Sequence, residues 1–433
     1  MIRHQPDGAG SKRYAAIKEG TVRGVRVSFR TVIALVVLVA GVTAGGSSAR
    51  TGGAATPNAG KTTTITFAHW SSSPVELASI RATLAAFERS HRSINVKEIN
   101  LDPYPEGMLA RFAARKPPDI FYVDSAYFPD WVSQGVLQPI DSYVKAQHVN
   151  TKRFYKSMLN AFKYKGKLYG FPKDWSPLAM QVNTSMLAKA NVSAPTNWAQ
   201  LQTAGTALKA AGQPPICLGI DLARILAFMY QNGGGFLNAS RTQAIVNSAA
   251  NQTAVSTYIN WLKSGVAQTP AQLGVGWCGE ALGKEKASII FEGNWVTSFM
   301  NETYPKVAWK AVPMVRNKSR GNLGFTVSYS IAKDSKHKQQ AFTLLKYLGG
   351  QTGMRIWTQA VGYLPSRSDV KPPSGRSVYL KEAPATHPWQ FAPGFTKVID
   401  TANSEFQSAY EGKESVAQAL SNIQAAATAA LRH

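Results

Sequence analysis

The sequence predicts an α/β fold, and three observations lead to this prediction. Short apolar strands alternate with amphipathic helices from residue 63 to residue 124, a pattern typical of a sheet covered by helices. The 433 residues suffice for two or three domains, because a domain usually has ~100–200 residues. Hydrophobic residues make up 44% and charged residues 17% of the chain, which excludes a wholly disordered polyelectrolyte and leaves enough apolar side chains for buried cores.

The first strand and the first helix are predicted from residue types and their spacing. In residues 63–68, Ile65 and Phe67 alternate with threonines, which favours a strand. The segment Ser73–Glu76 predicts a helix start, because it has the spacing of a capping box and Pro74 suits the first helical position. One apolar stripe follows at helical spacing, formed by Leu77, Ile80, Leu84 and Phe87.

Two more strands complete this first unit. Residues 94–99 form the second strand, residues 105–115 a short helix, and residues 119–124 the third strand. A β-α-β-α-β unit folds most economically as a parallel sheet with helices on both faces, and ligands bind such sheets at the carboxyl ends of the strands. That rim is expected to carry Trp70, Ser71, Asp124 and Ser125.

Later helices are predicted from their apolar stripes and end signals. They run from a cap at Thr196 to Gly212, from Val255 to Gly265, from Ser335 to Gly350 and from Val416 to Ala427. Residues 325–332 alternate as a strand. Since no fixed-period repeat occurs, a solenoid or propeller is not expected.

The N-terminal segment is predicted to be an export signal. A basic leader precedes the apolar run Thr31–Ala44, and small or polar residues follow. We expect a signal peptide over residues 1–44, a flexible linker over residues 45–61, and a location in the periplasm or on the outer face of the cell membrane. The alternative is an uncleaved anchor, although the run is shorter than the ~20 residues of a membrane span. No cysteine ends the run, so no lipoprotein is expected.

The net charge of +24 is the strongest compositional bias of the chain. It would suit a nucleic-acid binder, but the basic residues are dispersed rather than gathered in an aromatic-interleaved motif. We therefore expect a solvated basic surface and no nucleic-acid partner. The only two cysteines are Cys217 and Cys278, which after export form either one disulfide or two separate buried thiols.

No catalytic, cofactor or metal motif is found. The pattern Gly274–Gly279 has G-x-G-x-x-G spacing but follows no apolar strand, and the P-loop, H-E-x-x-H and G-x-S-x-G patterns are absent from the sequence. The histidines are scattered, so no metal site is expected. The enzyme alternative is a glycosidase whose acid pair joins Asp124 to Asp221 or Glu292.

Several segments together resemble the family 1 extracellular solute-binding proteins of ABC importers, the maltose-binding-protein-like group. The resembling segments are Phe67–Trp70, Pro118–Asp124, Trp131–Asp141, Gly166–Pro172, Gln181–Asn183, Pro195–Trp198, Ile289–Trp295, Ser335–Leu348 and Gly362–Pro365. Their order and spacing across residues 62–433 make the resemblance specific for the family but not for a ligand. Val182 and Thr184, the neighbours of Asn183, depart from the residues found at these positions in the family, so maltose is not assumed to be the ligand.

The resemblance implies a two-lobed periplasmic-binding-protein fold of type II, each lobe a mainly parallel sheet flanked by helices. The chain would cross the hinge three times, near Lys173–Ser176, Leu323–Thr326 and Arg367–Pro372. Lobe 1 would hold residues 62–173 and 326–370, and lobe 2 residues 174–325 and 371–433. A ligand between the lobes would favour a closed, monomeric form that the permease subunits of the transporter recognise.

A sugar site needs flat aromatic platforms together with carboxylates and amides that bind hydroxyl groups. The resemblance places four tryptophans near the cleft: Trp70, Trp175, Trp295 and Trp389. For each of them a place in the hydrophobic core is the alternative. The polar candidates are Asp124, which ends a strand, Asp174 at the first hinge crossing, and Asp221 and Arg224, where the resemblance implies polar ligand contacts. Gly324 is a further candidate, because a glycine would let a hinge strand approach the ligand closely.

Two of these polar candidates also have simpler explanations. Asp124 could instead cap the following helix, and Arg224 could be the counter-ion of Asp221. The predicted function is capture of a sugar or oligosaccharide for uptake, without a cofactor. The alternative keeps the fold and binds an anion such as a glycerophosphate or a uronic-acid sugar, which an inward-facing Arg224 would favour.

Overall fold

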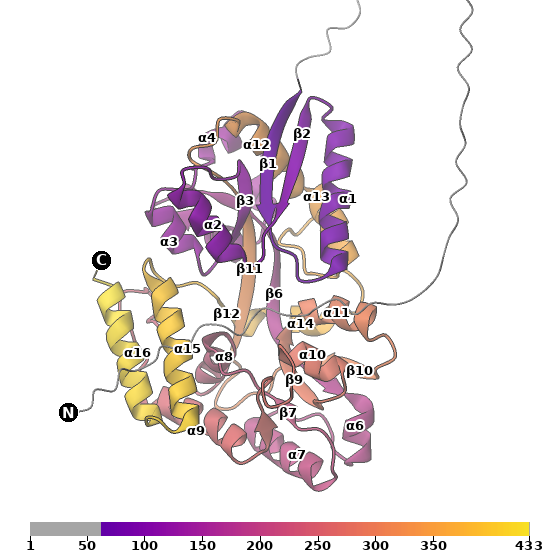
Figure 1. The fold of residues 1–433 in the computed structure, drawn as a ribbon, viewed down its shortest axis with the longest axis vertical. Coiled ribbons are helices and arrows are strands. Elements are labelled where there is room, and N and C mark those ends of the chain that lie inside the picture. The colour runs from indigo at the N-terminus through magenta and orange to yellow at the C-terminus, as the bar shows by residue number, and fades with distance from the viewer. Residues whose placement is uncertain (1–61, 433) are drawn as a thin grey trace, which may run out of the picture. The chain divides into compact units, whose positions relative to one another are not determined.

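Two long strands run through the middle of the fold and connect its halves (Figure 1). In the computed structural model, which describes residues 62–432, these strands are β6 (Gly170–Asn183) and β11 (Asn322–Ile331). They belong to a ten-stranded sheet. Eight of its strands follow the order β2-β1-β3-β11-β6-β9-β7-β8, while β10 pairs with β6 and β12 pairs with β11. The first part of β6 pairs with β11, and its last part pairs with β9 (Ile289–Gly293). The sheet is therefore continuous across the hinge.

The upper half in Figure 1 contains the predicted β-α-β-α-β unit. Its elements are β1 (Thr63–His69), α1 (Pro74–Ser90), β2 (Ile94–Asn100), α2 (Tyr104–Ala113) and β3 (Ile120–Asp124). Strand β1 pairs with β2 and with β3, in both cases parallel. The same half contains α3 (Phe128–Ser133), α4 (Asp141–Ala146), α5 (Lys156–Asn160), the hairpin β4 (Lys163–Tyr164) and β5 (Lys167–Leu168), α12 (Lys338–Leu348) and α13 (Gln351–Val361).

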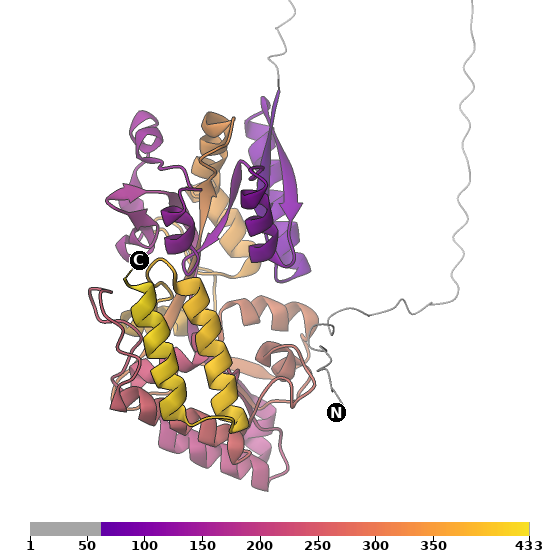
Figure 2. The same cartoon turned by 60° about the vertical axis from the view of Figure 1, so that its left-hand side comes forward.

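The lower half consists of strands that follow the crossing and of the helices around them. The strands are β7 (Ile216–Cys217), β8 (Ala267–Gln268), β9 and β10 (Trp309–Val312), and β12 (Thr386–Pro388) pairs with β11 at the hinge. The helices are α6 (Thr184–Lys189), α7 (Trp198–Ala210), α8 (Leu222–Gln231), α9 (Ala249–Lys263), α10 (Cys278–Gly283), α11 (Trp295–Thr303), α14 (Ser377–Glu382), α15 (Phe395–Glu411) and α16 (Val416–Ala430). Figure 2 shows α15 and α16 side by side on this half.

Each half is built around its own hydrophobic core. The first core draws its buried residues from 65–171 and 327–370. The second draws them from 178–323 and 389–427, with Ala126 as a contribution from the other half. We call the parts packed around these cores the first lobe and the second lobe.

The sheet is mixed, with its antiparallel pairs at the crossing. Strands β1, β2 and β3 are parallel to one another, as are β7, β8 and β9. By contrast, β11 is antiparallel to both β3 and β6. The physical reason is that β6 leaves the first lobe whereas β11 returns to it, so the two strands cross the hinge in opposite directions.

Four predicted helix starts differ in detail from the structure. Ser73 caps α1 by accepting a hydrogen bond from the Glu76 backbone N–H, but the Glu76 carboxylate accepts one from Ser72 N rather than closing the capping box. The cap of α7 is Asn197, not Thr196, because the hydroxyl and N–H of Thr196 both donate to Gln200. Helix α9 begins at Ala249, earlier than Val255, and helix α12 begins at Lys338, later than Ser335.

The predicted signal peptide (residues 1–44) and linker (residues 45–61) lie outside the described residues. Within residues 62–432, no helix is both long enough and apolar enough to cross a membrane.

Candidate functional site

A cavity of about 250 Å³ lies between the two lobes, and we call it the inter-lobe cavity. The first lobe contributes Trp70, which follows β1, and Asp124, which ends β3. The second lobe contributes Arg224 and Trp295. Trp70 and Asp124 also line an adjoining hollow of about 430 Å³, whose wall includes Ser71. The cavity is therefore found at the predicted rim of the sheet.

The two tryptophans in this cavity come from opposite lobes. The Trp70 ring packs edge-on against Tyr104 and Tyr122, with centroids 4.8 and 5.0 Å apart. Trp295 opens α11, and its indole Nε1 donates to the Glu292 carboxylate at 3.1 Å. The indole folds back over Gly293, where a Cβ atom would collide with it. The glycine two residues before Trp295 thus has a steric reason.

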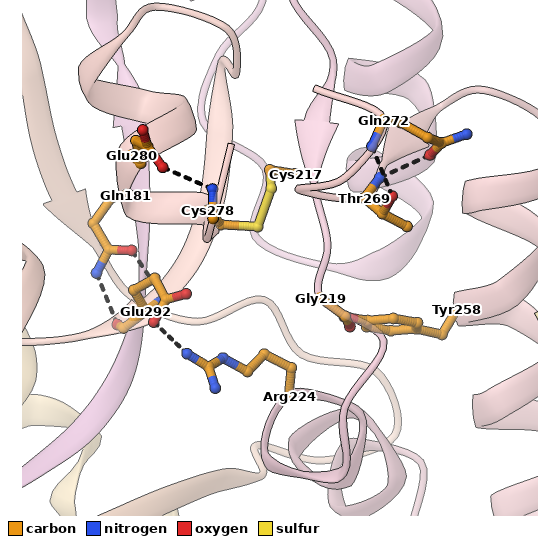
Figure 3. Close-up of a disulfide and its surroundings, with 11 residues drawn as sticks. Gln181, Cys217, Gly219, Arg224, Tyr258, Thr269, Gln272, Cys278, Glu280 and Glu292 are labelled. Carbon is orange, nitrogen blue, oxygen red and sulfur yellow. Dashed lines mark hydrogen bonds and ion pairs between the residues drawn. A yellow bond between two sulfur atoms is a disulfide. The ribbon is translucent and has the colours of Figure 1, made fainter. Parts of the chain in front are cut away.

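Arg224 forms ion pairs with two carboxylates, one of which, Glu292, is drawn with it in Figure 3. Its guanidinium lies 2.6 Å from the Glu292 carboxylate on β9 and 3.4 Å from that of Asp221. Asp221 also caps α8, because its side chain accepts a hydrogen bond from Arg224 N. Burial alone would lower the pKa of Arg224, but these carboxylates outweigh it and raise the pKa. The guanidinium is therefore charged and already paired.

Strand β6 contributes a second ion pair where it crosses the hinge. Lys173 Nζ lies 2.5 Å from Asp174 Oδ2, and the same oxygen accepts a hydrogen bond from Trp357 Nε1 at 2.7 Å. Both charged side chains line the cavity and are buried. Asp174 therefore has protein partners of its own, which stabilise its charge at the hinge.

Asp124 has a different environment. Its Oδ1 accepts a hydrogen bond from Ala126 N at 2.8 Å, and within residues 62–432 it forms no ion pair. The carboxylate makes a local turn rather than capping α3, whose cap is Tyr127. Burial raises its pKa to about 6, so folding makes the ionised carboxylate less favourable than it is in water.

Asp124→Asn is expected to stabilise the ligand-free protein. Because the folded-state pKa lies above the unfolded value, the ionised carboxylate destabilises the fold at pH values above about 6. The amide should raise the free energy of unfolding by about 1–2 kcal/mol at pH 8, after allowance for the partial exposure of the side chain. The gain should vanish toward pH 4. Denaturant unfolding at both pH values measures this, and an equal effect at both would contradict it.

Five other predicted residues lie outside the inter-lobe cavity, and one of them is Asp221, the helix cap described above. Trp175 and Gly324 line a separate cavity of about 540 Å³. Alternate residues of a strand point to opposite faces, so Trp175 faces away from Asp174 and Ser176, which line the inter-lobe cavity. Trp389 is buried in the second core against Phe325 and Phe391. Ser125 is buried, and its N–H donates to Thr326. Gly324 lies close to Thr386 of β12.

Sequence reasoning missed several residues of this cavity. They are Ser72, Glu76, Tyr122, Lys173, Ser176, Asn294, Phe325, Thr326, Val327 and Tyr363. Glu76 was interpreted only as part of a helix start. By alternation Ser176 shares the strand face of Asp174, whereas Lys173 lies where the pairing register of β6 and β11 shifts. Within residues 62–432, no cluster of His, Cys, Asp or Glu is arranged to hold a metal ion.

The two cysteines form a disulfide (Figure 3). It connects the end of β7 to the start of α10. Strand β7 leads to the α8 cap at Asp221, and α10 leads to β9, which carries Glu292. The disulfide therefore joins the two segments that carry the Arg224 ion pairs.

Comparisons with known proteins agree with this fold. The family described as bacterial extracellular solute-binding protein matches residues 71–355. A binding protein of Brucella abortus (strain 2308) is 24% identical over 369 residues, which cover 80% of this chain and 88% of that protein.

Solved structures share the same architecture. An ABC substrate-binding protein from Listeria monocytogenes in complex with cycloalternan is 22% identical and has a TM-score of 0.78, covering 85% of this chain and 99% of that chain. UgpB from Mycobacterium tuberculosis in complex with glycerophosphocholine is 18% identical and has a TM-score of 0.74, covering 84% and 98%. At these identities the likeness shows the two-lobed α/β fold, and the family match covers more than half of the chain. The chain belongs to the bacterial extracellular solute-binding protein family.

Proposed function

We propose that the protein is the extracytoplasmic solute-binding component of an ABC transporter, which captures a sugar or oligosaccharide and delivers it to the membrane permease. The observation that carries the proposal is the inter-lobe cavity, where Trp70 and Trp295 present one indole from each lobe beside the Asp124 carboxylate. Sugars offer apolar C–H faces to such rings and hydroxyl groups to such carboxylates. The cycloalternan complex of the Listeria protein supports this ligand class.

An anionic ligand is the second candidate, because Arg224 and Lys173 both line the cavity. Each is already paired with a carboxylate, so an anion would have to compete with an existing partner. We therefore favour a hydroxylated ligand without negative charge over a phosphate or a uronate. Affinity that falls steeply with added salt would instead support the anion.

We propose binding without catalysis. The glycosidase alternative requires a carboxylate pair that flanks the substrate, but Asp221 and Glu292 are both bound to Arg224. Incubation with aryl glycosides and oligosaccharides is expected to give no products, and turnover that is lost in Asp124→Asn would contradict this.

We infer that the ligand closes the two lobes about the hinge. The proposed lobes are residues 62–173 with 326–370, and residues 174–325 with 371–433. The separate composition of the two cores supports this division. We further propose that the protein acts as a monomer after export by residues 1–44, either in the periplasm or on the cell surface.

A thermal-shift screen over sugars and phosphates, followed by X-ray scattering with the best ligand, tests the proposed function. A ligand that binds only the folded protein raises Tm, and closure reduces the radius of gyration. A chain that binds no saccharide, or whose scattering profile is the same with and without saturating ligand, would contradict the proposal.

One contact between the lobes is expected to favour closure. Asp130 on α3 in the first lobe is buried, and its carboxylate accepts hydrogen bonds from Gly394 N and from the N–H and hydroxyl of Thr396 at the start of α15. Asp130→Ala should weaken ligand binding about tenfold, because a hydrogen bond to a charged group is worth ~1.5–3 kcal/mol and this one exists only when the lobes meet. Calorimetry gives the affinity, and scattering should show a larger ligand-free radius.

Asp141→Ala is the matched control for this contact. Its carboxylate also accepts a hydrogen bond from a backbone N–H, that of Leu168, but both groups lie in the first lobe. This variant should lose stability and keep its affinity. Equal affinities for the Asp130 and Asp141 variants would show that the α3–α15 contact does not stabilise closure.

A further inference from the structure

The inter-lobe cavity has more carboxylates than positively charged side chains. Lys173 and Arg224 are each matched by a carboxylate, at 2.5 Å from Asp174 and 2.6 Å from Glu292. Asp124 and Glu76 also line the cavity, and within residues 62–432 neither forms an ion pair. An uncompensated carboxylate away from bulk water is costly unless a cation or several donors face it. The cavity therefore carries an excess of negative charge.

The same cavity contains one buried hydrogen-bond acceptor without a partner. Glu76 is not that acceptor, because it accepts hydrogen bonds from two uncharged donors, Ser72 N at 2.7 Å and the Tyr363 hydroxyl. Asn294 is fully buried, and its side-chain oxygen has no hydrogen-bond partner in the described part of the chain. A buried acceptor without a partner is rare in folded proteins. A ligand that fits this wall of the cavity therefore carries hydrogen-bond donors.

Aromatic rings complete a surface that attracts positive charge. The rings of Trp70 and Tyr122 pack against each other at 5.0 Å, and Trp295 faces the cavity from the other lobe. Aromatic faces attract ammonium groups. One ammonium is already held in this way, because Lys173 Nζ lies 4.0 Å from the Trp357 ring centroid and 5.1 Å from that of Tyr122.

We propose that the captured solute is a polyol with an ammonium group, which binds against Asp124 between Trp70 and Trp295. The inference rests on the proposed function and narrows its ligand class from any sugar to a cationic one. Amino sugars and choline-type headgroups both offer this chemistry. A neutral sugar would leave the excess carboxylate charge of the cavity without a counter-charge.

Calorimetry on the full chain at pH 7 with three probes tests this proposal. The probes are a glucosamine disaccharide with free amines, its N-acetylated counterpart, which is uncharged, and glycerophosphocholine, a zwitterion that carries both a quaternary ammonium group and a phosphodiester. The free-amine disaccharide should bind at least tenfold more tightly than the uncharged disaccharide. If glycerophosphocholine binds instead, and Asp124→Asn weakens its binding at least tenfold, the ammonium group comes from a choline-type headgroup.

Asp124→Asn separates this inference from the function itself. The amide has nearly the same shape and can still bind a hydroxyl group, so it should abolish the tenfold preference by weakening the binding of the free-amine disaccharide at least tenfold more than that of the uncharged one. Asp334→Asn, which removes an exposed carboxylate, is the control and should change neither affinity. Equal affinity for charged and uncharged disaccharides, unaffected by Asp124→Asn, would overturn the inference and leave sugar capture intact. Failure of every saccharide and polyol to bind would overturn the proposed function instead.

The pH dependence provides a second readout. In the wild-type protein the affinity for the ammonium probe should fall as the pH drops below about 6, where Asp124 becomes protonated, whereas the affinity of Asp124→Asn should stay flat. The other titratable or charged groups that line the two hollows around Asp124 are Glu76, Asp102, Tyr104, Tyr122, Tyr127, Lys173, Asp174, Arg224 and Tyr363. A pH profile that survives in Asp124→Asn would assign the titration to one of these groups and contradict the proposal.

Discussion

Replacing Trp295 with alanine is expected to weaken ligand binding by at least a hundredfold, or about 3 kcal/mol. The indole is partly buried and packs against both lobe cores and against the cluster around the disulfide. Its Nε1–H also satisfies Glu292, the partner of Arg224. Alanine would remove one wall of the inter-lobe cavity and one donor to a buried carboxylate.

Two further variants separate the roles of this indole. Trp295→Phe keeps a flat face but loses the Nε1 donor, so it should retain more affinity than alanine. Trp198→Phe is the control, because Trp198 is a second-core tryptophan whose Nε1 donates to Gln231. It should reduce stability without changing affinity. Calorimetry that finds wild-type affinity for a correctly folded Trp295→Ala would remove this residue from the site.

Removing the disulfide is expected to lower the free energy of unfolding by about 4 kcal/mol. Cys217 and Cys278 are separated by 61 residues, and in the chain-entropy description a loop of this length stabilises the fold by about that amount. The double Cys→Ser variant should show this loss in denaturant unfolding. Its affinity should change little, because β9 and α8 remain joined by the Arg224–Glu292 ion pair.

Reduction of the wild-type protein is a direct check on the double variant. The chain has two cysteines in total, so a thiol reductant acts only on this bond. Reduced wild-type protein and the serine variant should unfold at the same denaturant concentration. An unchanged midpoint after complete reduction, verified by thiol titration, would refute the expected stabilisation.

Local sequence signals predicted the local structure well. The β1-α1-β2-α2-β3 unit follows from residue alternation, the Ser73 cap and one apolar stripe, all of which act over a few neighbouring residues. Where two adjacent polar residues compete, the signal is ambiguous. Asn197 rather than Thr196 caps α7, because Thr196 is bound to Gln200.

The site depends on partners that are far apart in the sequence. Arg224 and Glu292 are 68 residues apart, and Asp174 and Trp357 are 183 apart. Local sequence patterns do not reveal contacts between such distant residues, so these interactions could not be predicted. One signal was available, however. Had residues 170–183 been interpreted as a single strand, alternation would have placed Trp175 on the face opposite Asp174 and Ser176.

The sheet order has a consequence for how the chain acquires its structure during synthesis. Strand β3 is paired on one side by β1 and on the other by β11, which returns from residues 322–331. Until those residues emerge from the ribosome, a newly made first lobe has an unpaired strand edge and cannot complete its core. A polypeptide that crosses a membrane in unfolded form would benefit from this delay, because premature folding of its N-terminal half is disfavoured by the order in which its strands appear.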